Sequence, residues 1–227
     1  MRGSRGPLTL AAVSAIAFVV LGALVAAHAT RHLDASAREL FRPHDEWGPL
    51  QWHADVVVEG LKPSRIAWVL PVVAAMVSWR RHSWRPLGYA LLIGGTTAVL
   101  TLLSKVLVQR PDTHGKVSLL GGSYPSGHTV TILVVFGGSL LVLTPRTRWW
   151  QWLLVGGLGT LMGYCLLVEA AHWFTDVVGA LLLATAVLST ASTLRLRQPT
   201  GRRGDPGPSG HSSSADSRRN WSASSSS

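Results

Sequence analysis

The sequence is poor in charged residues and has a single cysteine, Cys165. One cysteine cannot form a disulfide within the chain, which excludes a fold stabilised by disulfides. Only 14% of the 227 residues are charged whereas 47% are hydrophobic, and this excludes an ordinary soluble domain of this size. Six stretches contain no charged residue: 6–30, 66–79, 86–104, 117–145, 149–168 and 177–194.

The uncharged stretches predict helices that span a membrane. A spanning helix needs about 17–25 mostly apolar residues, and five of the six stretches approach or exceed that length. The stretch 66–79 is shorter, but Arg65 and Arg80 can extend their side chains to the membrane surfaces and so lengthen it. We therefore predict an all-α fold: a polytopic membrane helix bundle with six transmembrane helices.

The charges between these helices are unevenly distributed. The N-terminus, the turns near 80–85 and 146–148 and the tail beyond 194 hold 13 Lys and Arg against two acids. The segments 31–65, 105–116 and 169–176 hold 8 Lys and Arg against 9 acids. Because Lys and Arg accumulate on the cytoplasmic side, we predict a multi-pass plasma-membrane protein with cytoplasmic N- and C-termini. The net charge of +10 thus indicates topology, and without a basic soluble module we expect no nucleic-acid partner.

The chain divides into four predicted parts. They are the first transmembrane helix (1–28), an extracytoplasmic loop (29–65), a membrane domain (66–197) and a disordered cytoplasmic tail (198–227). The tail is rich in Pro, Gly and Ser and cannot bury enough apolar surface to fold. The first helix is signal-like, because Ala27-His28-Ala29 follows an apolar run. That run, Leu8–Ala27, exceeds the usual 7–15 residues of a signal core, so we expect a retained helix; cleavage would leave five spans.

Three polar clusters lie at the outer ends of the predicted helices. They are KVLVQRPDTHGK (105–116), SYPSGH (123–128) and EAAHWFTD (169–176). Polar groups buried in a membrane are costly unless they have partners or a function. Since the three clusters share one side of the membrane, we predict that they assemble into one site.

The second cluster has the composition of an anion-binding helix start. Pro125 disfavours helix in the residue before it, so Ser126 or Gly127 is expected to open the helix. A helix start presents unpaired N–H groups and the positive end of the helix dipole, which bind phosphate. The Ser126 hydroxyl, the Gly127 N–H and the His128 ring can all reach such an anion. A capped helix start with an incidental histidine is the alternative.

The other two clusters supply a histidine–carboxylate pair and cations. His172 and Asp176 are four residues apart, so a helix would place them on one face with Cβ atoms about 5–6 Å apart. The carboxylate can hold one ring N–H and leave the other nitrogen to attack or accept a proton. Lys105 and Arg110 can neutralise a phosphate. A structural polar pair and ordinary interfacial cations are the alternatives, and Glu169 alone is thin support for a metal site.

The order of these motifs resembles the type 2 phosphatidic acid phosphatase (PAP2) superfamily of membrane lipid phosphatases. The resemblance covers about residues 87–194 and rests on Lys105 with Arg110-Pro111, on PSGH at 125–128, and on His172 with Asp176. It implies a PAP2-like core and an enzyme that hydrolyses a phosphate or diphosphate monoester, such as phosphatidate or polyprenyl diphosphate, at the extracytoplasmic surface. It also implies that no metal or cofactor is required.

The resemblance assigns a role to each candidate residue. His172 would be the nucleophile that forms a phosphohistidine, Asp176 would orient it, and His128 would protonate the leaving oxygen. The phosphate oxygens would be held by Lys105, Arg110, Ser126 and Gly127. The lipid phosphate and the membrane are the expected partners, and the sequence does not indicate an oligomeric state.

Two positions depart from the family pattern. Asp112 stands where the first motif carries an arginine, and Cys165-Leu166 stands where the third motif begins with Ser-Arg. Loss of one charge-stabilising donor can cost about 10²–10³ in rate. The chain is therefore either a phosphatase with an impaired or specialised phosphate pocket, or a catalytically impaired PAP2-like protein that binds lipid or a protein partner. Few polar residues lie near the middle of the spans, which disfavours a transporter.

Overall fold

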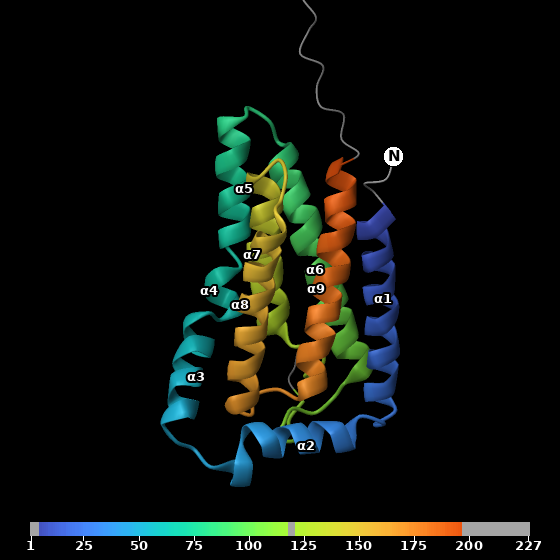
Figure 1. Cartoon of the computed structure of the whole chain (residues 1–227), viewed down its shortest axis with the longest axis vertical. Coiled ribbons are helices and arrows are strands. Elements are labelled where there is room, and N and C mark those ends of the chain that lie inside the picture. Colours follow the sequence, from blue (N-terminus) through green and yellow to red (C-terminus); the bar gives the residue numbers. More distant parts are fainter. Residues whose placement is uncertain (1–4, 118–120, 197–227) are drawn as a thin grey trace, which may run out of the picture. The chain divides into compact units, whose positions relative to one another are not determined.

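The computed structural model describes residues 5–117 and 121–196, and the predicted tail (198–227) lies outside the described residues. The described chain is helical, as predicted (Figure 1). Its elements are α1 (Arg5–Ala26), α2 (Arg31–Phe41), η1 (Pro43–Asp45), α3 (Pro49–Gly60), α4 (Pro63–Ile66), α5 (Val69–Arg80), α6 (Arg85–Val108), α7 (Gly127–Leu143), α8 (Trp149–Val168) and α9 (Phe174–Leu196).

Four of these helices are long and apolar enough to cross a membrane: α1, α6, α8 and α9. A fifth candidate is the pair Pro49–Ile66 and Val69–Arg80, which is bent by 46° and counts as one span if its two halves cross together. The remaining apolar helix, α7, has only 17 residues. The multi-pass helix bundle is confirmed, while the count of six spans stays a prediction that depends on the bent pair and α7.

Residues 29–65, predicted as an extracytoplasmic loop between two spans, are mostly helical, and their side of the membrane stays a prediction. They form α2, which lies across one end of the bundle, and then η1, α3 and α4 (Figure 1). Pro43, Pro49 and Pro63 each stand at the first turn of a helix in this segment. Proline is favoured there because its missing N–H would have no helical partner and its fixed φ suits the helix.

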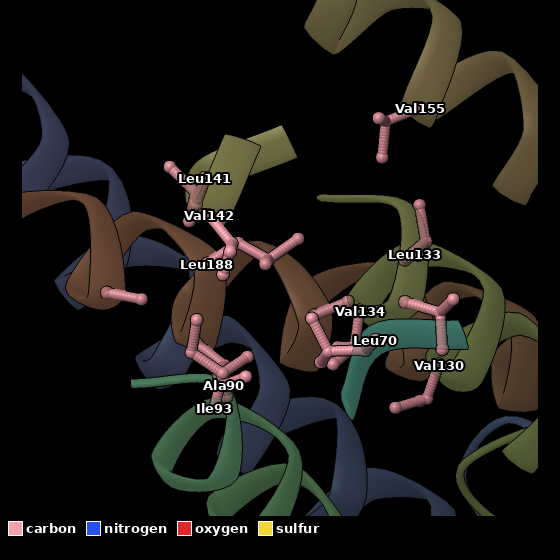
Figure 2. Packing of buried hydrophobic residues seen from close by; sticks show 14 of the residues in the cluster. Leu70, Ala90, Ile93, Val130, Leu133, Val134, Leu141, Val142, Val155 and Leu188 are labelled. Atoms are coloured by element: carbon pink, nitrogen blue, oxygen red, sulfur yellow. The ribbon is translucent and has the colours of Figure 1, made fainter. Parts of the chain in front are cut away.

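Helix α7 forms the centre of the bundle and packs against α4, α5, α6, α8 and α9. Figure 2 shows part of this core, with Leu70 of α5 beside Val134 of α7 and with Leu188 of α9 beside Val142 of α7. The helices approach closely where a glycine replaces a larger residue, since a Cβ on Gly137 would lie 2.6 Å from Leu188 Cδ1. A helix that is apolar on all sides is typical of such a buried position.

Helix α1 is part of the same bundle. It packs along α9, and the Phe18 and Tyr124 rings stack with centroids 5.7 Å apart. The Tyr124 hydroxyl also donates a hydrogen bond to the Phe18 carbonyl, at 3.1 Å. The helix thus contacts the segment that leads into α7; its retention in the mature protein stays a prediction.

Candidate active site

The three polar clusters meet at one end of the bundle, which we call the site end. Helices α6 and α8 end there, whereas α7 and α9 begin there. Hydrogen bonds join the clusters in pairs: Ser123 N–H to Arg110 O (2.8 Å), Ser126 N–H to Asp176 O (3.0 Å) and Trp173 Nε1–H to Pro111 O (3.0 Å). The prediction that they assemble is confirmed. The arginine-bearing turns between α5 and α6 and between α7 and α8 lie at the opposite end.

The two histidines of the motifs face one another across this end. His128 lies in the first turn of α7, and His172 lies just before α9. Their ring centroids are 6.4 Å apart and the ring planes are inclined at 67°. The His128 Nε2 atom is buried and has no hydrogen-bond partner among the described residues. A buried polar nitrogen without a partner is costly, so this atom is well suited to meet a ligand.

Asp176 fixes the orientation of His172. The distance from His172 Nδ1 to Asp176 Oδ2 is 3.2 Å, and the carboxylate is fully buried. The Trp173 N–H donates to the same oxygen, also at 3.2 Å. The two residues do not share a helix: α9 begins only at Phe174, and its first turn brings the carboxylate back to the histidine. A carboxylate at Nδ1 makes that nitrogen the donor and leaves Nε2 with its lone pair.

The start of α7 is built as an anion-binding terminus. The helix begins at Gly127 and Ser126 is its N-cap, as Pro125 predicted. The Ser126 hydroxyl is fully buried and accepts hydrogen bonds from Thr129 N (3.5 Å) and Thr129 Oγ1 (3.3 Å). A Cβ added at Gly127 would meet nothing within 4 Å, so space lies open beside the first free N–H groups of the helix. This is the geometry that a phosphate needs at a helix N-terminus.

Lys105, in the last turn of α6, brings one positive charge to the site. Its ammonium donates to the carbonyls of Gly122 (2.8 Å) and Ser123 (3.3 Å). The third N–H of an ammonium remains for a ligand. Gly121 and Gly122 let the segment before α7 lie close to the backbone of residues 105–110. Gly121 has φ +102°, and a Cβ on Gly122 would collide with the backbone of Arg110. The lysine therefore both holds the segment before α7 and carries charge toward His128 and Asp176.

Arg110 is paired with two carboxylates. Its Nη1 donates to Asp176 Oδ1 at 2.8 Å and to Thr175 Oγ1 at 2.7 Å. Its Nη2 donates to Asp34 Oδ2 at 2.5 Å, and the guanidinium carbon lies 5.1 Å from the centroid of the Trp173 ring. Asp34 belongs to α2 and no sequence motif pointed to it, since it lies 76 residues from Arg110.

The structure explains both departures from the family pattern. The Asp112 carboxylate accepts hydrogen bonds from the N–H groups of His114 (2.9 Å) and Lys116 (2.8 Å), so it closes its own turn. Leu166 is fully buried and packs in a cluster with Ala54, Val58 and Ile66. Helices α3 and α4 thus cover the face of α8 on which the family carries an arginine. An apolar side chain suits that covered face, whereas an unpaired guanidinium would be costly there.

The junction of α3 and α4 supplies further charges that sequence reasoning missed. Lys62 forms an ion pair with Glu59, and both charges are near enough to act on His128. Glu169 follows α8, and burial together with the nearby Asp55 carboxylate raises its pKa from 4.5 to about 7. Among residues 5–117 and 121–196, no three His, Cys, Asp or Glu side chains form a group that could hold a metal ion.

The fold and site together define an integral-membrane protein with paired histidines at one end of a helix bundle, one of them held by a carboxylate. The model of the PAP2 superfamily matches residues 84–200, just over half of the chain. The chain therefore belongs to the PAP2 superfamily, and it has the architecture of the membrane lipid phosphatase branch.

A solved structure supports the same fold. The chain is similar to the first transmembrane PAP2 type phosphatidylglycerolphosphate phosphatase from Bacillus subtilis, with a TM-score of 0.70 and 18% sequence identity. The similarity covers 86% of this chain and 98% of the Bacillus chain. No curated protein matches the chain.

Proposed function

We propose that the protein is an integral-membrane phosphatase that hydrolyses a phosphate or diphosphate monoester of a lipid through a phosphohistidine, without a metal ion. The observation that carries this proposal is the arrangement of the two histidines. Their ring centroids lie 6.4 Å apart at the site end, with His172 held by Asp176 and His128 beside the open start of α7. A phosphorus atom placed between the two rings would meet a nucleophile on one side and an acid on the other.

In the first half of the reaction, the His172 Nε2 lone pair attacks phosphorus and the bond from phosphorus to the lipid oxygen breaks. Protonated His128 gives its proton to the leaving oxygen, so the lipid departs as a neutral alcohol, or as a monophosphate from a diphosphate. Asp176 accepts the Nδ1–H bond and stabilises the positive charge that develops on His172. The product is a phosphohistidine and a neutral His128.

In the second half, water attacks the same phosphorus from the side that the lipid has left. Neutral His128 takes a proton from that water, and the bond from phosphorus to Nε2 breaks. Inorganic phosphate leaves, His172 regains its lone pair and His128 is protonated again, so the cycle closes. Phosphoryl transfer of this kind depends mainly on positioning and charge stabilisation.

The phosphate oxygens are held, in this proposal, at the start of α7. The Gly127 N–H and the dipole of the helix face the open space, and Lys105 adds a positive charge. Ser126 contributes as the cap that shapes the helix start. We place the site on the extracytoplasmic side, because the arginine-bearing turns at 80–85 and 146–148 lie at the other end of the bundle.

The test is phosphate release by the purified full chain in detergent, with EDTA present. The panel contains phosphatidate, phosphatidylglycerophosphate and a polyprenyl diphosphate, since the Bacillus neighbour acts on the second of these. We expect at least one lipid to be hydrolysed in EDTA, and we expect His172→Ala to abolish release. His32→Ala, at an exposed position on α2, is the matched control and should retain activity. Equal release by wild type and His172→Ala would overturn the assignment.

A second candidate function is a PAP2-like protein that binds lipid phosphates without turnover. It is favoured by Asp112 and Leu166, where two family arginines are missing. In that case wild type and His172→Ala would both be inactive on the whole panel, yet inorganic phosphate would still raise the melting temperature of the wild type. Turnover by the wild type excludes this second candidate.

A further inference from the structure

Asp34 occupies an unusual position for an acidic residue. Within α2, which the structure describes in full, it is the only buried residue, and its relative exposure is 1%. Its Oδ1 accepts a hydrogen bond from the Thr175 N–H at 2.9 Å, and its Oδ2 accepts from Arg110 Nη2 at 2.5 Å. A buried carboxylate is costly unless it is fully paired, and here every partner belongs to a segment of the active site.

Through these bonds α2 closes over the start of α9. Thr175 is the second residue of α9, so its N–H is one of the donors that a helix start leaves unpaired. A carboxylate at this place satisfies the donor and interacts favourably with the helix dipole. Two arginines, one in α2 and one just after it, also contact the site segments: Arg38 donates to Thr113 O (3.0 Å) and Arg42 donates to Glu169 O (2.8 Å). The segment of α2 is thus hydrogen-bonded to the first polar cluster (105–116) and to the third (169–176).

Arg110 lies between Asp34 and the carboxylate that orients His172. The order of contacts is Asp34 Oδ2, Arg110 Nη2, Arg110 Nη1, Asp176 Oδ1, and then Asp176 Oδ2 to His172 Nδ1. Asp34 and Asp176 are 1% and 0% exposed, and the arginine side chain is 11% exposed. A phosphate that bound the inner face of this guanidinium would have to displace one of the two buried carboxylates. Both terminal nitrogens of the arginine already donate to these carboxylates, Nη1 to Asp176 and Nη2 to Asp34.

We propose that Asp34 is a positioning residue for the catalytic histidine, that it acts through Arg110, and that Arg110 belongs to this chain of ion pairs rather than to the phosphate pocket. The proposal rests on the proposed function in taking His172 as the nucleophile. It replaces the role that the family resemblance assigned to Arg110, and it gives α2 a part in catalysis.

The physical consequence concerns geometry rather than substrate affinity. With Asp34 in place, Arg110 is held from both sides, and Asp176 keeps Oδ1 on Arg110 and Oδ2 on His172 and the Trp173 N–H. Without the Asp34 charge, the guanidinium is free to shift toward Asp176. The Asp176 carboxylate then fixes the orientation of the His172 ring less well. A displacement of about 1 Å in a reacting group can cost about 10²-fold in rate while binding persists. The expected signature is therefore a fall in kcat with little change in KM.

The experiment compares Asp34→Asn, Arg110→Gln and the double variant in steady-state hydrolysis, with inorganic phosphate as a competitive inhibitor. We expect each single variant to lower kcat about 10–100-fold while KM and the phosphate Ki stay within about threefold. The double variant should be no slower than Arg110→Gln alone, since residues that act as a unit are not additive. Glu39→Gln, an exposed acid on α2, is the matched control and should match the wild type.

Arg110→Lys covers the case in which Asp34→Asn does not fold. Lysine keeps the charge but has no fork to join two carboxylates. If Arg110 positions Asp176, this variant should lose nearly as much kcat as Arg110→Gln. If Arg110 serves as a charge for phosphate, lysine should restore most of the activity, and that result would overturn the proposal. An Arg110→Gln variant with unchanged kcat and a phosphate Ki raised tenfold or more would overturn it as well.

A binding measurement separates this proposal from the proposed function. The rise in melting temperature caused by inorganic phosphate is recorded for wild type and Arg110→Gln. If the wild type binds phosphate but hydrolyses no lipid, the phosphatase assignment fails. In that case an equal rise in the melting temperature of Arg110→Gln still supports the placement of Arg110 outside the phosphate pocket. Loss of protection in Arg110→Gln rejects that placement whether or not the enzyme turns over. If the wild type shows neither turnover nor protection, the catalytic role of Asp34 falls with the proposed function.

Discussion

The two halves of the chain contribute to the site in different ways. Helices α6–α9 and the segments that join them carry every residue that belongs to a motif, and the family match covers residues 84–200. Helices α2–α4 lie outside that match, yet they supply Asp34, Arg42 and Lys62 to the same end of the bundle. They also cover α8 at Leu166. The comparison teaches that the motif half carries the residues we propose to react, whereas the N-terminal half contacts their segments and covers the position at which the family carries arginine.

Asp176→Asn tests the motif half and should give the largest effect. The amide cannot hold the Nδ1–H of His172 with the same charge and would favour the wrong tautomer. We expect kcat to fall by about 10²–10⁴. Hydrolysis by purified variants measures this. A variant with more than a tenth of wild-type activity would show that Asp176 does not orient the nucleophile.

Leu166→Arg tests whether α3 and α4 cover the position at which the family carries an arginine. The new guanidinium would be buried against the apolar side chains of Ala54, Val58 and Ile66. We expect a loss of about 3–5 kcal/mol in the free energy of unfolding and no gain in activity. Leu166→Met, which conserves volume, should cost less than about 1.5 kcal/mol. A folded Leu166→Arg variant with raised kcat/KM would mean that the position still opens into the phosphate pocket.

Lys62→Gln tests the charge that the α3–α4 junction brings to His128. If Lys62 partly replaces the missing arginine, removing it should lower kcat/KM about tenfold. This loss is smaller than that expected for a buried donor, because the lysine side chain is partly exposed. Added salt should shrink the difference between variant and wild type. Lys116→Gln, also a lysine at the site end, is the control. An unchanged kcat/KM would leave Lys105 and the start of α7 as the groups that hold phosphate.

Glu169 should give a smaller, pH-dependent effect. Its pKa is raised to about 7 in the folded state, so the folded protein keeps a proton that the unfolded chain releases near pH 4.5. Stability therefore decreases as pH rises from about 4.5 to 7 and levels off above. The side chain is only partly buried, so we expect about 1 kcal/mol. Melting curves at pH 5 and pH 8 should show Glu169→Gln gaining stability over the wild type only at pH 8; a constant difference would contradict the raised pKa.

Much of the site could be predicted because its signals are local. Pro125 fixes where α7 begins, and the spacing of His172 and Asp176 places the ring and the carboxylate within reach. The charge-free stretches likewise predict the long helices of the bundle. In each case the residues that determine the structure lie within one or two helical turns of each other.

The contributions of the N-terminal half were not predictable for the opposite reason. Asp34 has the sequence context of an ordinary acid on an exposed amphipathic helix, and its partners Arg110 and Thr175 are 76 and 141 residues away. The sequence marks Leu166 as a departure from the family pattern but does not show that α3 and α4 pack over it. Pro49 and Pro63 could not by themselves mark α3 and α4 in the sequence, because proline both ends helices and begins them. Only the packing of α2–α4 on the bundle decides these cases.

The most direct test of the central claim is to trap the covalent intermediate and find the residue that carries it. Wild-type protein is mixed with an intact lipid phosphate that the panel has shown to be a substrate. The mixture is quenched in alkali to preserve phosphohistidine, and the protein is digested and analysed by mass spectrometry. The account predicts phosphate on the peptide that contains His172, absent from His172→Ala. Phosphate on any other residue, or rapid lipid hydrolysis by His172→Ala, would contradict it.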